Sequence, residues 1–448
     1  MNFDHIQKIY FVGIGGIGMS ALARYFNGIG KEVHGYDKTE TGLTRKLVEE
    51  GMTIHYDENV EAIPSGVDLV VYTPAVPDSH AELQYFRTHD FPLKKRAEVL
   101  GIISRNRKCI GVAGTHGKTT TSSLLTYLLR SGGLDCSAFL GGVARNFASN
   151  FVEGQSEWVV VEADEYDRSF LHLRPEMAIV LSMDADHLDI YGDVAKIHEG
   201  FNQYVSGVAE GGSIIHKVGL PLVVPDKRQA MTFGFEKGDL RAENIRVVNG
   251  YFEFDLKSPF GDIDQIKMSL PGHHNIENAL AAIGIAQQLK IDSEAIKKAL
   301  ASFKGIKRRF EIVYRDEQVV YIDDYAHHPS ELKAAIHAAR TLFPKRKITG
   351  IFQPHLYSRT QDFADGFAEA LDQLDKAFLL DIYPARELPI PGVSSEMILK
   401  KMKNPDKQLI QKDAFPDAMK YIQPDVLLTM GAGNIDTLVE PIKTFLSS

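Results

Sequence analysis

The sequence predicts an α/β protein of three domains built on mostly parallel sheets. The chain has 448 residues, and a domain takes roughly 150 residues, so the length alone favours about three domains. Apolar strand-like runs alternate with helical patterns along the chain, which favours parallel sheets covered by helices. In three places such a run breaks into a glycine-rich or polar loop just before a helix, and these places mark the three domains.

Composition excludes several classes of protein. Hydrophobic residues make up 44% and charged residues 24% of the chain, which is typical of a folded globular protein. The chain has no run of about 18 apolar residues, so we expect no membrane-spanning helix. The first residues lack the pattern of a signal peptide. The formal charge of −9 argues against a nucleic-acid-coating surface. Because only two cysteines occur, we expect a protein of the reducing cytoplasm. From the charge and the lack of a long apolar run, we expect no nucleic-acid or membrane partner.

The first segment pairs a strand-like run with a glycine loop. KIYFV precedes Gly13-Ile-Gly15-Gly16-Ile17-Gly18, and a helical pattern follows. Glycines let the backbone approach a pyrophosphate, which then meets the free amides of the helix. Asp37 ends the next strand and could bind a ribose hydroxyl. The motif fits a nicotinamide cofactor, another nucleotide diphosphate or a plain tight turn. The basic stretch 104–108 after this segment is either a linker or a solvated turn.

The second segment carries a sharper signal. Gly114-Thr115-His116-Gly117-Lys118-Thr119-Thr120 stands between the strand CIGVA and a helical pattern. Loop amides can cradle phosphate oxygens, the lysine can reach the β and γ phosphates, and the first threonine can bind Mg²⁺. The loop departs from G-x-x-x-x-G-K-T because Val112 occupies the first glycine position. We still interpret it as a triphosphate site.

Acidic residues follow two further strands of this segment. Glu162-Ala-Asp164-Glu165 ends one strand and Asp184-Ala-Asp186-His187 ends the other. Parallel strands bring their carboxyl ends to one edge of a sheet, where ligands bind, and oxygen ligands there suit Mg²⁺. Any one of these residues could instead cap the helix after it. Short strands are expected over 213–270 and a helix over 273–289.

The third segment begins near Phe310 and also turns polar at its strand ends. Tyr325, His327 and His328 follow one strand, and His355, Tyr357, Ser358 and Arg359 follow the next. Asp381, Tyr383 and Arg386 come after a third strand. Together these residues indicate a cleft for a small polar ligand. A diphosphate unit, a triphosphate unit and a polar cleft in series favour an ATP-driven joining reaction over redox chemistry.

These motifs resemble the Mur ligases of bacterial cell-wall synthesis, in the same order and over essentially the whole chain. The pairing of DDYAHHP with FQPHLYSRT is most similar to the branch that adds L-alanine to UDP-N-acetylmuramate. A sister branch, which reattaches recycled tripeptide to the same nucleotide sugar, is the nearest alternative. The motifs that carry the resemblance are GIGGIGMSALA, AGTHGKTTTSSLL, EADEYDRSFLHL, DADHLDIYGD, HHNIENALAA, FKGIKRRFE, DDYAHHPSEL, FQPHLYSRT and MGAGNID.

The resemblance implies a Rossmann-like UDP-sugar domain (1–106), a central P-loop ATPase domain (107–308) and a C-terminal Rossmann-like amino-acid domain (309–448). It also implies that ATP phosphorylates the substrate carboxylate, that the amine of L-alanine attacks the acyl phosphate, and that two Mg²⁺ ions assist. A carboxylate resists amines until one oxygen becomes a good leaving group, so this order makes chemical sense. We expect a monomer or a homodimer.

Residue by residue, the resemblance assigns several roles. Lys118 matches the γ-phosphate lysine and Thr119 the first magnesium ligand, while Glu162 and His187 match the ligands of a second magnesium. The other matches are Asn278 for adenine, Arg309 and Asp323 for ATP, Tyr325, His327 and Arg359 for L-alanine, and Gly15, Gly16, Ile17, Gly18 and Asp37 for UDP.

Two positions depart from the family pattern. Many relatives carry a carbamylated lysine about 15 residues after the metal histidine, where this chain has 200–203, GFNQ. Alanine-adding relatives often have arginine where this chain has Leu356, and Arg386 could compensate. Two other classes remain open at this stage. A nicotinamide oxidoreductase would leave Lys118 unexplained, and a nucleotide-switched binding module would release phosphate independently of any amino acid.

Overall fold

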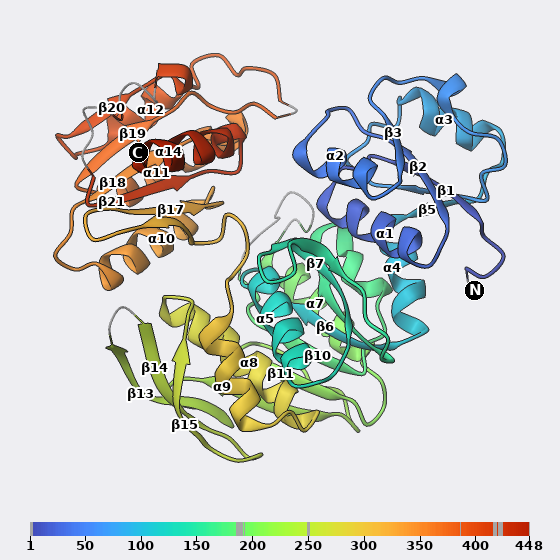
Figure 1. The fold of residues 1–448 in the computed structure, drawn as a ribbon, viewed down its shortest axis with the longest axis horizontal. Helices are drawn as coiled ribbons and strands as arrows, with labels where there is room; N and C mark the ends of the chain where they lie inside the picture. The colour runs from blue at the N-terminus through green and yellow to red at the C-terminus, as the bar shows by residue number, and fades with distance from the viewer. Residues whose placement is uncertain are drawn as a thin grey trace. The chain divides into compact units, whose positions relative to one another are not determined.

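The computed structural model describes residues 3–184, 191, 193–248, 251–385, 387–414, 419 and 424–447. These residues form three separate β-sheets of five, ten and six strands, each covered by helices (Figure 1). The predicted α/β class with three domains and a mostly parallel central sheet is confirmed. None of the described helices is long and apolar enough to cross a membrane.

The first sheet is entirely parallel, in the order β3-β2-β1-β4-β5. Alternate residues of β1 face opposite sides: Phe11 packs with Phe26 of α1, whereas Tyr10 packs with Phe86 of α3. Helices therefore cover both faces. The elements are β1 (Lys8–Val12), α1 (Ile17–Gly28), β2 (Glu32–Tyr36), α2 (Gly42–Glu49), β3 (Thr53–His55), η1 (Val60–Ala62), β4 (Leu69–Tyr72), α3 (Ala81–Thr88), β5 (Leu93–Lys95) and α4 (Arg96–Arg105).

The central sheet has the order β15-β14-β13-β12-β11-β10-β6-β9-β7-β8. Its core strands β11, β10, β6, β9 and β7 are parallel, whereas β8 returns antiparallel to β7. Helix α5 packs against α8, α9 and β7, and α7 packs on the opposite face through Phe201 and Tyr204.

The strands are β6 (Lys108–Ala113), β7 (Ser137–Ala144), β8 (Ser149–Val152), β9 (Trp158–Ala163), β10 (Met177–Val180), β11 (Ser213–Lys217), β12 (Gln229–Gly234), β13 (Leu240–Val248), β14 (Tyr251–Lys257) and β15 (Ile263–Met268). The helices are α5 (Lys118–Ser131), η2 (Tyr166–His172), α7 (Val194–Ser206), α8 (His273–Gln288) and α9 (Ser293–Ser302). The short strands expected over 213–270 and the helix after them are confirmed. Stretch 104–108 is the end of α4, a two-residue turn and the start of β6, so the solvated-turn interpretation fits better than a linker.

The third sheet has the order β16-β17-β21-β18-β19-β20 and is parallel except for the β16–β17 pair. Helices α10, α11 and α12 cover one face and α14 the other. The elements are β16 (Glu311–Arg315), β17 (Val320–Asp324), α10 (Pro329–Leu342), β18 (Ile348–Phe352), α11 (Tyr357–Leu371), β19 (Lys376–Leu379), α12 (Ser395–Lys401), β20 (Lys407–Leu409), η3 (Lys412–Ala414), β21 (Val426–Met430), η5 (Asn434–Leu438) and α14 (Val439–Ser447).

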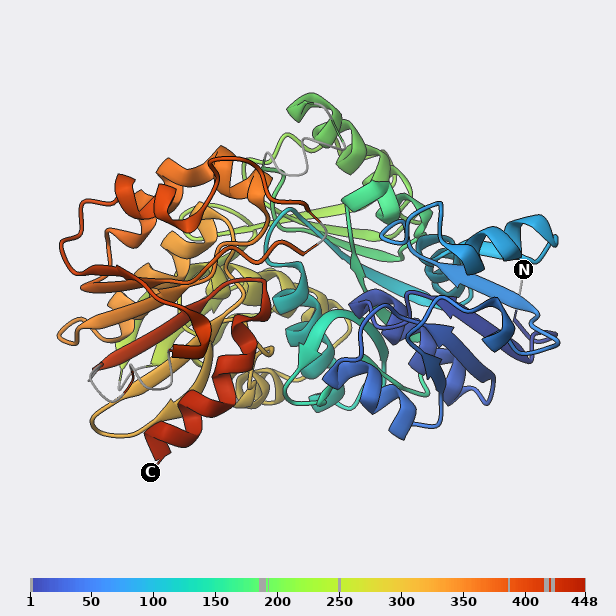
Figure 2. The ribbon, with the colours of Figure 1, turned by 90° about the horizontal axis from the view of Figure 1, so that it is seen from above.

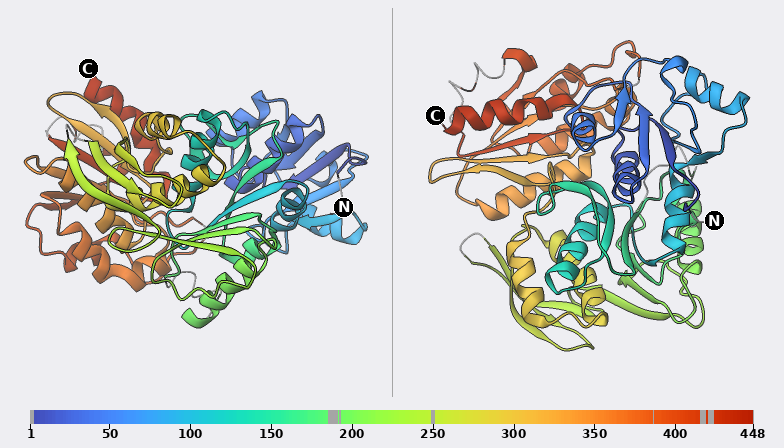
Figure 3. Two further views of the ribbon diagram at one scale, coloured as in Figure 1. Left: turned by 90° about the horizontal axis from the view of Figure 1, so that it is seen from below. Right: turned by 45° about the vertical axis from the view of Figure 1, so that its right-hand side comes forward.

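Two compact units contain these sheets. The first two sheets belong to one unit, residues 1–246 and 253–304, and the third belongs to a unit of residues 305–448 with 247–252. The first unit is continuous because one hydrophobic core runs from β1 and α1 through Phe139 and Phe151 of the β7–β8 hairpin to α7. Figures 2 and 3 show the sheets of both units from other sides. The boundaries at 106 and 308 remain predictions.

Candidate functional site

The loop between β6 and α5 has the backbone geometry of a phosphate-binding loop. Gly117 takes φ +80° immediately before the helix, and a Cβ there would lie 2.6 Å from Oδ1 of Asn278. Gly114 takes φ +146°, and a Cβ there would lie 2.9 Å from Cβ of Leu181. Both positions therefore require glycine. No side chain caps α5, so its first amides remain directed at the loop, as in an anion site.

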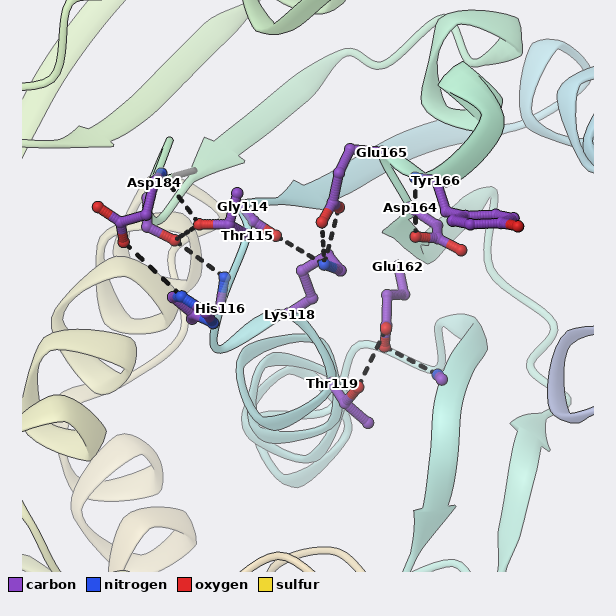
Figure 4. A network of polar contacts seen from close by, with 12 residues as sticks. Gly114, Thr115, His116, Lys118, Thr119, Glu162, Asp164, Glu165, Tyr166 and Asp184 are labelled. Atoms are coloured by element: carbon purple, nitrogen blue, oxygen red, sulfur yellow. Dashed lines mark hydrogen bonds and ion pairs between the residues drawn. The ribbon is translucent and has the colours of Figure 1, made fainter. Parts of the chain in front are cut away.

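Lys118 points into this loop and is held at two places (Figure 4). Its Nζ donates to the Gly114 carbonyl at 2.7 Å and lies 2.9 and 2.7 Å from the two carboxylate oxygens of Glu165. Burial lowers the pKa of Lys118, but Glu165, Asp164 and Glu162 outweigh it and the net shift is upward. The ammonium therefore stays charged. Burial also raises the pKa of Glu165, an effect that the Lys118 charge opposes.

Glu162 and Thr119 form the second contact of the site. The Thr119 hydroxyl donates to Glu162 Oε1 at 3.0 Å, and the Gly141 amide of β7 donates to Oε2 at 2.8 Å (Figure 4). Burial raises the pKa of Glu162, and the positive charge of Lys118 opposes this shift. A hydroxyl and a carboxylate this close are hard oxygen donors, and Mg²⁺ commonly uses one or two of them together with phosphate oxygens. Thr119 and Glu162 therefore fit a magnesium ion.

The outer rim of the loop is fixed by Ser182, just after β10. The Ser182 hydroxyl lies 2.9 Å from Thr115 Oγ1 and accepts the His116 amide at 2.9 Å. The Asp184 amide donates to Thr115 Oγ1 at 3.2 Å, and the Asp184 carboxylate lies 3.8 Å from His116 Nε2 (Figure 4). Thr120 follows in the first turn of α5. The loop is thus attached to β10, the neighbour of its own strand.

The first glycine loop is arranged around Asp37. The Gly15 amide donates to Asp37 Oδ2 at 2.7 Å, and a Cβ on Gly15 would lie 2.8 Å from the same oxygen. Gly16 and Ile17 are exposed at the start of α1, which has no side-chain cap. Gly18 lies against Arg96, whose Cδ would be 2.9 Å from an added Cβ. The structure therefore brings the five residues of the predicted UDP site together at the end of β1 and β2.

In the other unit, β17 ends in two acidic residues with different partners. Asp323 is buried, accepts the Thr429 hydroxyl at 2.6 Å and lies 3.3 Å from Arg308 Nε. Asp324 accepts the amides of Phe310 and Ala326 at 2.6 and 2.7 Å. Burial raises the pKa of Asp324 to about 6. Arg308, to which the sequence analysis gave no role, is thus the arginine that pairs with Asp323.

Arg309 belongs to the same group of side chains at the end of β17. We call this group the β17 cluster: Arg308, Arg309, Asp323, Asp324, Tyr325, His327 and His355. The guanidinium carbon of Arg309 lies 5.4 Å from the centre of the Tyr325 ring. The guanidinium carbon of Arg308 lies 5.1 Å from the same ring centre. The Tyr325 and His327 rings are 5.2 Å apart, and the His327 and His355 rings 6.2 Å. Burial lowers the pKa of His327, with Glu331 opposing that shift. The predicted residues Arg309, Tyr325 and His327 are therefore neighbours.

Arg359 lies in the first turn of α11 and is half-buried. Burial lowers the pKa of His327, and the positive charge of Arg359 contributes to the same shift. Leu356 precedes the helix with φ +70°, donates its amide to the Tyr383 carbonyl at 3.0 Å and accepts the Thr360 hydroxyl at 2.8 Å. Both bonds are made by its backbone atoms, so they do not need an arginine side chain at this position.

Several site contacts were not predicted. Glu165 was noted as an acidic strand-end residue but not as the partner of Lys118, and Ser182 and Arg308 received no role. The sequence feature that could have pointed to Glu165 is its position directly after Asp164, just beyond the end of β9. His187 and Arg386 lie outside the described residues. Among those described, no group of three or more His, Cys, Asp or Glu side chains is placed to hold a metal ion.

Comparison with known families matches all three parts of the chain. The model for the Mur ligase family, catalytic domain, matches residues 8–108. The Mur ligase middle domain matches 112–286, and the Mur ligase glutamate ligase domain matches 308–433. Asp37, the phosphate loop and the β17 cluster fall in these three matches in turn.

Curated proteins and solved structures match over the whole length. The UDP-N-acetylmuramate–L-alanine ligase of Flavobacterium psychrophilum is 50% identical over 448 residues, covering 99% of each chain. That of Flavobacterium johnsoniae is 48% identical over 451 residues, covering 100% of this chain and 99% of its own. The structure of the UDP-N-acetylmuramate–alanine ligase of Thermotoga maritima has a TM-score of 0.85 at 29% identity, covering 99% of this chain and 100% of its own. A murein peptide ligase of Psychrobacter arcticus shares the fold, with a TM-score of 0.72 at 23% identity and 99% of each chain covered. The family expected from the motifs is thereby confirmed, and the chain belongs to the Mur ligase family.

Proposed function

We propose that this protein is an ATP-dependent ligase that joins L-alanine to the carboxylate of UDP-N-acetylmuramate in cell-wall precursor synthesis. The observation that carries the proposal is the match, over 99% of both chains and at 50% identity, to a protein of that name. The site supports it physically, since a charged lysine, a helix N-terminus and a Thr119–Glu162 oxygen pair suit a nucleotide triphosphate and Mg²⁺.

The first step would activate the acceptor. A carboxylate oxygen of UDP-N-acetylmuramate attacks the γ-phosphorus of ATP, the bond to ADP breaks, and an acyl phosphate forms. Lys118 would leave Glu165 for the γ-phosphate and stabilise the charge that develops there. Thr119 and Glu162 are the residues that would hold Mg²⁺, and we expect His187 to hold a second ion. Magnesium, when bound, neutralises phosphate charge.

The second step would form the amide bond. The neutral amine of L-alanine attacks the acyl carbon, a tetrahedral intermediate forms, and phosphate leaves with the former carboxylate oxygen. Arg359 would bind the alanine carboxylate, because the guanidinium offers two parallel donors and the amine must stay free. Tyr325 and His327 would surround the amino acid. The roles of Asn278 toward adenine, and of Arg309 and Asp323 toward ATP, are part of the same proposal.

The substrates and the compartment follow from this assignment. Gly15, Gly16, Ile17, Gly18 and Asp37 would bind the UDP part of the acceptor, since exposed amides at a helix start suit a pyrophosphate. Two buried cysteines without a disulfide, Cys109 and Cys136, support a reducing cytoplasm.

A substrate panel tests the proposal. Phosphate release is measured with ATP, Mg²⁺ and UDP-N-acetylmuramate against L-alanine, L-serine, glycine and the recycled tripeptide. We expect release to depend on L-alanine above all. Preference for the tripeptide would support the recycling activity instead, and release that ignores every amine would support a nucleotide switch.

A further inference from the structure

The β7–β8 hairpin contacts both nucleotide sites of the first unit. On β7, the Gly141 amide donates to Glu162, the carboxylate of the phosphate-loop site, at 2.8 Å. On β8, across the hairpin from this region, Asn150 bonds to α1, the helix that begins at the first glycine loop. Helix α1 packs directly on both strands of the hairpin (Figure 1). The hairpin is therefore one physical link between the two sites, beside α4, whose Arg96 lies against Gly18 and 3.7 Å from Asp164.

Asn150 is completely buried and uses both ends of its amide. Its Nδ2 donates to the Ile17 carbonyl at 2.5 Å and to the Ser20 hydroxyl at 2.9 Å. Its Oδ1 accepts from Nη1 of Arg24. Arg24 is itself fixed by two bonds to Glu50, at 2.7 and 3.0 Å. Every hydrogen bond of Asn150 thus ends in the first or second turn of α1.

Beside these polar partners, aromatic rings fill the interface between α1 and the hairpin. Tyr25 of α1 lies 5.6 Å from Phe139 and 6.0 Å from Phe151, and these two rings lie 5.1 Å apart. A buried amide costs free energy unless it is fully bonded, and both ends of the Asn150 amide are bonded to α1. Sliding α1 along the hairpin would break these bonds. Buried polar groups at such places are best attested as devices that fix register.

We propose that Asn150 is a positioning residue that sets the register of α1 against the hairpin, and thereby the distance between the UDP-sugar loop and the phosphate loop. The inference rests on the proposed function. In that function the acceptor is held by one loop and the γ-phosphate by the other. A reacting oxygen must lie within about 3–3.5 Å of its target, and a 1 Å displacement costs on the order of 100-fold in rate.

The test variant is Asn150→Leu, which keeps the number and branching of the side-chain heavy atoms and removes the three bonds. Its partners keep other bonds: Arg24 retains Glu50, and the Ser20 hydroxyl retains the Ile17 carbonyl at 3.0 Å. We expect a midpoint of thermal unfolding close to wild type. We also expect dissociation constants for ATP and for UDP-N-acetylmuramate, each measured alone, within about threefold of wild type, and kcat reduced by about 10- to 100-fold.

A matched control comes from the same helix. Asn27 of α1 donates to the Glu50 carbonyl at 3.0 Å, within the first sheet's own layers, and does not bond the hairpin. Asn27→Leu makes the same chemical change without crossing to β8, so kcat should stay within about twofold. If Asn150→Leu does not yield folded protein, Asn150→Ser, which keeps a donor, should show the same loss of kcat at unchanged binding.

The outcomes separate the two claims. Wild type that forms the alanine adduct while Asn150→Leu keeps full kcat would overturn the positioning role and leave the proposed function standing. A loss of kcat that merely parallels loss of folded protein would overturn it as well. Wild type that is inactive with this acceptor would overturn both. A fall in kcat with intact binding and stability, absent in Asn27→Leu, is the expected result.

Discussion

Lys118 Nζ and Glu165 Oε2 lie 2.7 Å apart, and the Glu165 side chain is almost wholly buried at 2% exposure. Glu165 thus neutralises the positive charge of Lys118, which the γ-phosphate would need as its own partner. Nucleotide binding must therefore exchange one anionic partner of the lysine for another. Breaking a buried pair by removing one partner costs about 3–5 kcal/mol, since the remaining charge is left without compensation.

Glu165→Gln should consequently lower the stability of the nucleotide-free protein, and ATP with Mg²⁺ should restore most of the loss by giving Lys118 a new partner. The measurement is the thermal midpoint with and without nucleotide, where the variant should show the larger shift. Glu157→Gln is the control, because Glu157 pairs with Lys108 at 2.7 Å on the exposed surface, and such pairs contribute little. An equal nucleotide shift in wild type and Glu165→Gln would contradict the exchange.

Glu162→Ala should reduce kcat more than it weakens ATP binding. Thr119 remains as an oxygen ligand, while the carboxylate that we place on Mg²⁺ is gone. Raising the Mg²⁺ concentration should recover part of the rate if the defect is weaker metal binding. Steady-state kinetics over a magnesium titration decides this, and activity that is indifferent to Mg²⁺ in both proteins would rule out the metal role.

Arg359→Ala should raise the KM for L-alanine by about 10- to 100-fold, because a hydrogen bond to a charged group is worth about 1.5–3 kcal/mol. The KM values for ATP and the nucleotide sugar should change by a few-fold at most. Arg359→Lys should recover only part of the loss, since lysine lacks the fork.

Arg340→Ala is the matched control for this prediction, because Arg340 of α10 already pairs with Asp375, just before β19, at 2.6 Å, and we assign it no substrate. It should leave all three KM values unchanged. An unaltered alanine KM in folded Arg359→Ala would remove Arg359 from the amino-acid site.

Asp324 should make stability depend on pH. Burial raises its pKa from 3.8 to about 6, so between these values the unfolded chain releases a proton that the folded chain keeps. Stability from this group is therefore complete below about pH 4 and is lost as pH rises through 6, by up to about 3 kcal/mol. Asp324→Asn cannot titrate. The urea midpoint of wild type relative to Asp324→Asn should fall between pH 4 and 7, and a constant difference would contradict the shift.

The sequence was most informative where chemistry and topology agree. Lys118, Thr119 and Glu162 could be placed together because parallel strands end at one edge of a sheet. The structure brings Thr119 and Glu162 into contact beside Lys118. The partner of Lys118 was harder to predict, since three acidic residues lie within 162–165 and the turn after β9 decides which one faces the lysine. That turn includes left-handed conformations at Asp167 and Arg168, which no periodicity reveals.

The sequence also could not show which of two adjacent arginines pairs with Asp323, or that a single asparagine contacts a distant helix. Arg308 and Arg309 cannot be told apart by pattern, yet the left-handed backbone at Arg308, φ +61°, turns it toward Asp323. Asn150 stands in a short strand with no motif around it. Its importance depends on a contact with α1, about 130 residues earlier, which only tertiary packing creates.

In the proposed reaction, the acceptor carboxylate becomes an acyl phosphate, and one of its two oxygens leaves with the phosphate. The most direct measurement uses UDP-N-acetylmuramate carrying heavy oxygen in its carboxylate, with ATP, Mg²⁺ and L-alanine, and analyses both products by mass spectrometry. Lys118→Ala, which lacks the γ-phosphate charge partner, serves as the inactive control. The account predicts that each amide product formed is matched by one phosphate carrying one heavy oxygen. Phosphate without the label, or phosphate released without alanine adduct, would contradict it.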